Sequence, residues 1–151
     1  MKIYTVFGLL VAGLLMIPGL MTAEEADPSP YLEMSSHYEA IRLALLGDSL
    51  NSVDMHAKAI HQQAKKLAEQ TSPAKVGEAE SGAIDIGVAL KEIESATAGL
   101  AAAGDLVTAR EDFFALTKPM ARYRKHVGAD GTVVVYCSME KKAWIQPEGE
   151  I

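Results

Sequence analysis

The segment DLVTAREDFFALTKPMARYRKHV, residues 105–127, decides the fold. Its apolar residues recur alternately three and four positions apart, a spacing that places them along one side of an α-helix. Asp105 can cap the amino end of such a helix, and Gly128 can end it. The segment therefore predicts an amphipathic helix whose apolar side faces a core. Its apolar stripe consists of Leu106, Ala109, Phe113, Leu116, Met120, Tyr123 and Val127.

Three earlier segments, residues 31–45, 50–67 and 72–100, have the same apolar spacing. Gly47 follows the first segment as a helix-ending residue, and Ser72-Pro73 is a typical start for the third. Because the connections between the segments are short, successive helices should be antiparallel neighbours. The sequence therefore predicts an all-α fold, a four-helix up-and-down antiparallel bundle over residues 31–128.

The sequence pattern changes after Gly128. Residues 132–137, TVVVYC, are β-branched and aromatic, which is typical of a strand. Residues 143–146, AWIQ, can form a returning strand, with Trp144 as the expected anchor on the helices. We therefore expect residues 129–151 to form a short C-terminal β-hairpin packed on the bundle.

The first residues have the layout of a secretory signal. Lys2 precedes an apolar run over residues 3–20, and the small residue Ala23 precedes two glutamates. We expect residues 1–23 to be a signal peptide that is cleaved after Ala23, residues 24–30 to be a linker, and the protein to be periplasmic. The alternative is a retained membrane anchor, because about 20 apolar residues can span a bilayer.

Composition narrows the range of functions. The net charge of −6 at pH 7 argues against nucleic acid, which is bound by basic surfaces. A hydrophobic share of 49% excludes a disordered chain, and the single cysteine excludes an intramolecular disulfide. The sequence has no nucleophile–base pattern, no phosphate-binding glycine loop and no pair of inward carboxylates, so we expect no enzyme activity.

Two parts of the chain follow a recognisable residue pattern. Its members are Tyr31, Ala44-Leu45, Asp48, Ala57, Ala64, Leu67, Ala109-Arg110, Phe113, Leu116-Thr117, Val135-Tyr136-Cys137-Ser138-Met139, Ala143-Trp144-Ile145-Gln146 and Glu150-Ile151. Through them the chain resembles a bacterial exported domain-of-unknown-function family, also found fused to periplasmic copper/silver efflux adaptors of the CusB type. The chain differs at Ser138, where the family has proline, and the family pattern continues beyond Ile151 with a second cysteine. The resemblance implies a role in heavy-metal handling, with an efflux adaptor as a partner.

Cys137 and Met139 are the candidate metal ligands. Thiolate and thioether are soft ligands that suit Cu(I) or Ag(I). The two residues are two apart in the predicted strand, so their side chains should project from the same face. Two ligands underfill a site, so a third is expected from Met120, His126 or a residue beyond Ile151. The alternative is that both sulfur side chains are ordinary packing residues.

Apart from the third ligand, the histidines and two further methionines are not predicted to be metal ligands. His37, His56, His61 and His126 fall off the apolar stripes, which predicts solvent-exposed side chains. Met34 and Met120 fall on the stripes, which predicts packing in the core.

Two functions follow from these observations. The favoured hypothesis is a non-enzymatic periplasmic accessory module in heavy-metal handling, which binds Cu(I) or Ag(I) or docks to an efflux adaptor or another periplasmic protein. The alternative is a metal-free structural or protein–protein interaction bundle. Neither hypothesis involves nucleic acid, and a membrane is involved only if the N-terminal segment remains uncleaved.

Overall fold

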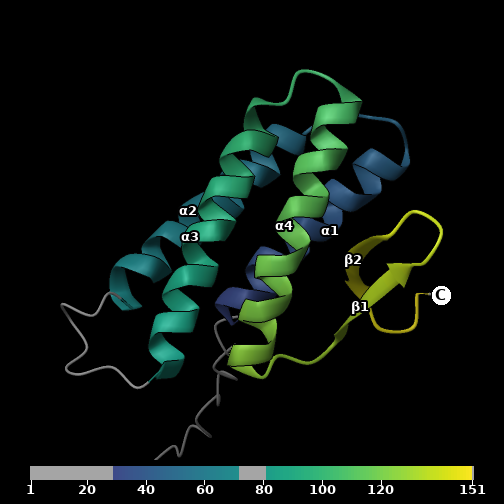
Figure 1. The fold of residues 1–151 in the computed structure, drawn as a ribbon. Helices are drawn as coiled ribbons and strands as arrows, with labels where there is room; N and C mark the ends of the chain where they lie inside the picture. Colours follow the sequence, from purple (N-terminus) through teal and green to yellow (C-terminus); the bar gives the residue numbers. More distant parts are fainter. Residues whose placement is uncertain (1–28, 72–80, 151) are drawn as a thin grey trace, which may run out of the picture.

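Four helices are followed by a two-stranded antiparallel hairpin in the computed structural model of the chain (Figure 1). The structure describes residues 29–71 and 81–150. The predicted signal peptide and the predicted start of the third helix at Ser72 lie outside these residues. The helices are α1 (Pro30–Leu46), α2 (Val53–Thr71), α3 (Ser81–Ala102) and α4 (Leu106–Val127), and the strands are β1 (Thr132–Cys137) and β2 (Lys142–Pro147).

Helix α4 begins and ends where its capping residues lie. The Asp105 carboxylate accepts the backbone N–H of Val107 at 2.9 Å and that of Thr108 at 3.0 Å. These bonds satisfy donors that have no partner within the first turn. At the other end Gly128 has a φ of 63°, a left-handed conformation that glycine adopts without a Cβ penalty. The predicted ends of this helix are confirmed.

Helix α1 begins slightly earlier than predicted. The Ser29 hydroxyl accepts the backbone N–H of Leu32 at 3.3 Å, and Pro30 lies in the first turn. Proline suits this position because its missing N–H would have no partner there. The last residue of the expected linker, residues 24–30, therefore belongs to the helix.

The connection between α1 and α2 is longer than predicted, because α2 begins later. Gly47 follows the last residue of α1 but has a φ of −84°, and the left-handed residue is Asp48, with a φ of 53°. A second left-handed residue, Ser52 with a φ of 64°, precedes the start of α2 at Val53. The apolar spacing predicts a start at Leu50, but a residue with positive φ lies outside the right-handed helical region. The helix therefore begins only after Ser52.

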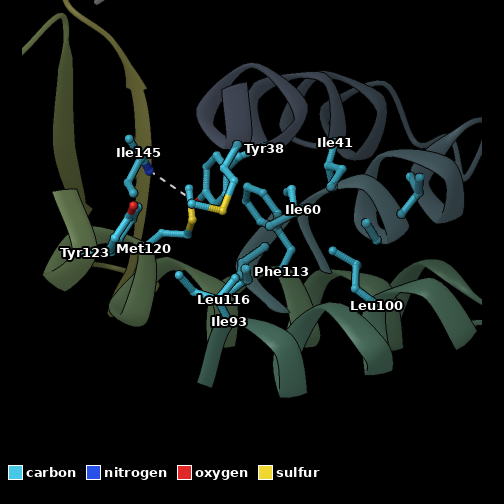
Figure 2. Packing of buried hydrophobic residues seen from close by; sticks show 14 of the residues in the cluster. Tyr38, Ile41, Ile60, Ile93, Leu100, Phe113, Leu116, Met120, Tyr123 and Ile145 are labelled. Carbon is cyan, nitrogen blue, oxygen red and sulfur yellow. Dashed lines mark hydrogen bonds between the residues drawn. The ribbon is translucent and has the colours of Figure 1, made fainter. Parts of the chain in front are cut away.

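The core lies between the helices and includes one side chain of the hairpin (Figure 2). Most described stripe positions are buried, and Met34 and Met120 are fully buried, which confirms their predicted packing role. Removal of such apolar surface from water is the dominant stabilising term in folding. The buried apolar residues are Tyr31, Met34, Tyr38, Ile41, Leu45, Val53, Ala57, Ile60, Ala64, Ala89, Leu90, Ile93, Leu100, Ala109, Phe113, Leu116, Met120, Tyr123 and Ile145.

The helices contact one another in a ring of four interfaces. Helix α1 packs against α2 and α4, and α3 packs against the same two helices. The hairpin lies beside α4 and contacts it through β2 (Figure 1). Among the described residues, no helix is both long enough and apolar enough to cross a membrane.

Ile145 anchors the hairpin most deeply, and the expected anchor Trp144 packs against the edge of the core. Strand β1 has its predicted bounds, and β2 extends the predicted residues 143–146 by one residue at each end. The register places Val134 opposite Ile145. Ile145 is 2% exposed, and its backbone N–H donates to the Tyr38 hydroxyl at 3.3 Å. Trp144 is half-buried at the edge of the core. Neighbouring residues in a strand face opposite sides, and Ile145 is the one of the two that is fully buried.

Candidate functional site

The two predicted metal ligands lie at the end of the hairpin. Cys137 is the last residue of β1, and Met139 lies in the hairpin turn, residues 138–141. The Cys137 side chain is half-buried with a free thiol, and Met139 is 87% exposed. Because β1 ends at Cys137, the alternation of side chains along a strand does not extend to Met139. The prediction that both project from one strand face is therefore wrong, although both lie at the same end of the hairpin.

The expected third ligands lie elsewhere. Met120 is fully buried in the same core cluster as Ile145 (Figure 2). His126 is exposed in the last turn of α4. Within residues 29–71 and 81–150, histidine, cysteine, aspartate and glutamate side chains form no group of three or more that could hold a metal ion. At the hairpin turn, the described part of the chain thus offers Cys137 and Met139 alone as sulfur donors.

A cation–π contact holds the strand residue opposite Cys137. Lys142 pairs with Cys137 across the two strands. The Lys142 ammonium lies 4.6 Å from the centroid of the Phe114 ring on α4, within the range of attraction between a cation and an aromatic face. All four residues of the turn beyond this pair are exposed. The Cys137–Lys142 end of the two strands is therefore packed against α4, whereas the turn that contains Met139 is exposed to solvent.

Three of the four histidines are not in the surroundings that the sequence predicts. His37 on α1 and His56 on α2 are half-buried, and their Nδ1 atoms lie 3.0 Å apart. His61 is also half-buried, with its Nδ1 3.0 Å from the carbonyl oxygen of Glu94 on α3. His126 is exposed, as predicted. The prediction fails because a residue beside an apolar stripe faces the neighbouring helix rather than open solvent.

The contact between His37 and His56 joins the Nδ1 atoms of two imidazole rings. Burial lowers the pKa of His37 below its ordinary value of 6.5, and the neighbouring His56 lowers this pKa further, whereas Glu33 raises it. In a neutral pair one Nδ1 donates its proton to the lone pair of the other. Neutral imidazole is also the form of histidine that binds metal ions. The pair therefore brings two potential nitrogen ligands together between α1 and α2.

A groove of about 270 Å³ lies between α1, α4 and β2. Its two guanidinium groups already have partners: Arg42 is bidentate to Glu39, and Arg110 binds the Leu45 carbonyl oxygen and the Asp48 carboxylate. The surface left for recognition is therefore mostly apolar. The lining residues are Arg42, Leu45, Leu46, Arg110, Phe113, Phe114 and Trp144.

No family model matches the chain, and comparisons with curated proteins and with solved structures likewise gave no match. The resemblance to the efflux-associated family therefore stays a prediction.

Sequence reasoning missed the contact between His37 and His56. A partial signal was present, because each histidine directly precedes a stripe residue, Tyr38 or Ala57. Such a residue lies at the edge of the apolar stripe, where a neighbouring helix can cover it. The spacing does not show which helix covers this edge or at what height, so the partner of each histidine could not be named.

Proposed function

We propose that the protein is a non-enzymatic accessory module in heavy-metal handling, which binds Cu(I) or Ag(I) through Cys137 and Met139. The single observation that carries this proposal is the exposure of the hairpin turn, where Met139 is 87% exposed two residues from the free thiol of Cys137. Both ligands are soft, as these cations prefer. Two ligands leave coordination positions open, so a partner such as an efflux adaptor can take over the ion.

The proposal includes an up-and-down antiparallel arrangement of the four helices as a scaffold for the hairpin. In each of three interfaces, the residue number rises along one helix while it falls along the other, which is the signature of antiparallel packing. The supporting contacts are Glu33–Gln63 and His37–His56 between α1 and α2, Glu92–Arg122 and Gly99–Asp112 between α3 and α4, and Tyr31–Tyr123 and Leu45–Arg110 between α1 and α4.

The proposal also places the module in the periplasm, after export and removal of residues 1–23. The support is the basic, apolar and small-residue layout of this segment in the sequence. Expression of the full chain in a Gram-negative host, followed by N-terminal sequencing of the periplasmic fraction, tests it. The expected new N-terminus is Glu24, and recovery of the uncut chain in the membrane fraction would favour the retained anchor.

A Cu(I) titration tests the proposed site. Reduced protein is titrated anaerobically against a chromophoric Cu(I) chelator, together with Cys137→Ser and Met139→Leu. The matched control is Met55→Leu, because Met55 is also exposed, at 56%, but lies on α2. We expect Cys137→Ser to abolish competition with the chelator, Met139→Leu to weaken it, and Met55→Leu to leave it unchanged. Equal affinity in the wild type and Cys137→Ser, or no binding by the wild type, would reject the site.

The second candidate function is a metal-free protein–protein interaction module. The observation that favours it is the apolar groove between α1, α4 and β2, at whose mouth Leu46 is 71% exposed. A purified efflux adaptor of the CusB type is the partner to test, by calorimetry without metal. If this function is correct, Leu46→Lys abolishes adaptor binding while Cys137→Ser does not. Binding that depends on Cu(I) and Cys137 would favour the first function instead.

A further inference from the structure

His37 and His56 bring two imidazole rings into direct contact between α1 and α2. The Nδ1 atoms are 3.0 Å apart, the ring centroids are 5.2 Å apart, and the ring planes are tilted by 42°. Both side chains are half-buried, so one side of the pair is covered by protein and the other is open to water. The proposed Cys137 site involves neither histidine.

The backbone positions of both rings are set by the core. His37 lies next to Tyr38, which is 1% exposed, and His56 lies next to Ala57, which is fully buried. Each histidine therefore stands on a helix whose apolar side is packed, and the rings can turn only about their own side-chain bonds. Ligands on packed helices are held in place more closely than ligands on loops.

The separation of the two nitrogens allows both to bind one metal ion. With metal–nitrogen bonds of about 2.0–2.1 Å, two nitrogens 3.0 Å apart subtend an angle of about 95° at the metal. This angle fits neighbouring positions of square-planar or tetragonal coordination, which Cu(II) and Ni(II) adopt, better than the wider angle of tetrahedral Zn(II).

We infer that His37 and His56 form a binding site for a divalent, tetragonally coordinated transition-metal ion, for which Cu(II) is the strongest-binding member of the series. Binding requires both Nδ1 lone pairs. The proton shared in the present N–H···N contact is therefore carried by Nε2 of the same ring in the bound state. This change of tautomer moves the proton within one ring and releases none.

Glu33 adds a negative charge to the same seam between the helices. It lies one helical turn before His37 on α1, and its carboxylate accepts a hydrogen bond from the Gln63 side chain of α2 at 2.9 Å. A carboxylate here compensates part of the charge of a divalent cation, as it already favours the charged form of His37. Water on the open side of the pair fills the remaining positions.

A Cu(II) titration in a Cys137→Ser background tests this site and keeps it separate from the proposed Cu(I) site. The protein is used without an affinity tag, and electron paramagnetic resonance records whether nitrogen ligands are bound. We expect one equivalent of Cu(II) with nitrogen hyperfine structure. His37→Gln and His56→Gln should each lower the affinity by more than the roughly 10–100-fold that the loss of an outer-shell partner causes.

The matched controls are His61→Gln and His126→Gln, which should leave Cu(II) binding unchanged. Unchanged affinity in His37→Gln and His56→Gln, loss of binding in His126→Gln, or a copper spectrum without nitrogen coupling would each overturn the inference. A measurement on the protein with both histidines present guards against misfolded variants. Substoichiometric Cu(II) should broaden the imidazole NMR signals of His37 and His56 before those of His61 and His126, and the reverse order would reject the site.

Discussion

The hydroxyl group of Tyr38 lies 3.3 Å from the backbone nitrogen of Ile145 and accepts its N–H. The same hydroxyl is 2.7 Å from the Thr117 hydroxyl on α4. One side chain of α1 therefore connects the last helix and the hairpin, across 79 and 107 positions of sequence. The Tyr38 ring also packs against Phe113, with ring centroids 4.5 Å apart. These contacts fix the hairpin to the helices, and with it the position of Cys137.

Removal of the Tyr38 hydroxyl should destabilise the protein. In Tyr38→Phe the ring still fills the core, but the buried N–H of Ile145 loses its partner. Because an unsatisfied buried donor costs about 1–3 kcal/mol, the free energy of unfolding should fall by about that amount. Urea denaturation followed by circular dichroism measures the change.

The control for this substitution is Tyr123→Phe. Tyr123 is 5% exposed, and no hydrogen bond of its hydroxyl is found within the described residues. Removal of the Tyr123 hydroxyl should therefore lower the free energy of unfolding by less than Tyr38→Phe does. Equal effects of the two substitutions would contradict the role assigned to the bond between Tyr38 and Ile145.

Alkaline pH should weaken the fold through the same residue. Burial raises the pKa of Tyr38 to about 12 from its ordinary value of 10.0. The folded state therefore keeps a proton that the unfolded state releases, so the stabilisation is complete below pH 10 and is lost as the pH rises towards 12. Thermal melts between pH 9 and 12 should show this loss, and Tyr38→Phe should show a shallower one. Parallel slopes in the two proteins would argue against the assignment.

Two glycines of α3 should respond differently to alanine. A Cβ at Gly87 would meet no atom within 4 Å, whereas a Cβ at Gly99 would lie 3.0 Å from the Asp112 carboxylate. Glycine inside a helix is about 1 kcal/mol less favourable than alanine. Gly87→Ala should therefore stabilise the protein by about 1 kcal/mol, and Gly99→Ala by less because Asp112 has to move. Denaturant titration of both variants checks the order, which a larger gain at Gly99 would contradict.

The capping bond of Asp105 should be visible in the acid stability of the protein. Hydrogen bonds from the Thr108 backbone and then from its hydroxyl lower the pKa of Asp105 below 3.8. The stabilisation is therefore present above pH 3.8 and is lost as the pH falls through the lower folded-state value. Asp105→Ala should lower the melting temperature at pH 7, and this deficit should shrink in acid. Asp105→Asn should keep a cap that does not depend on pH, so its melting temperature at pH 7 should stay close to that of the wild type. A large decrease of the melting temperature in this variant would contradict the role assigned to the Asp105 cap.

Much of the fold could be predicted from local patterns. The apolar stripe and the two caps located α4, and the β-branched run located β1, because these elements depend on residues close together in sequence. The start of α2 was missed because the spacing of apolar residues contains no information on the left-handed conformation of Ser52. The candidate ligands Cys137 and Met139 were chosen by their chemistry, and their predicted common face failed because β1 ends at Cys137.

The sequence by itself determined the helices, the strands and the residues that are able to bind a metal. Only the tertiary structure decided which residues meet, since Ile145 rather than Trp144 enters the core and His37 meets His56. The physical reason is that periodicity specifies the side of an element on which a residue lies, but not the partner that covers this side. The partner is chosen by the joint packing of all four helices and the hairpin, which has to bury apolar surface at high density and to provide hydrogen-bond partners for most buried polar groups.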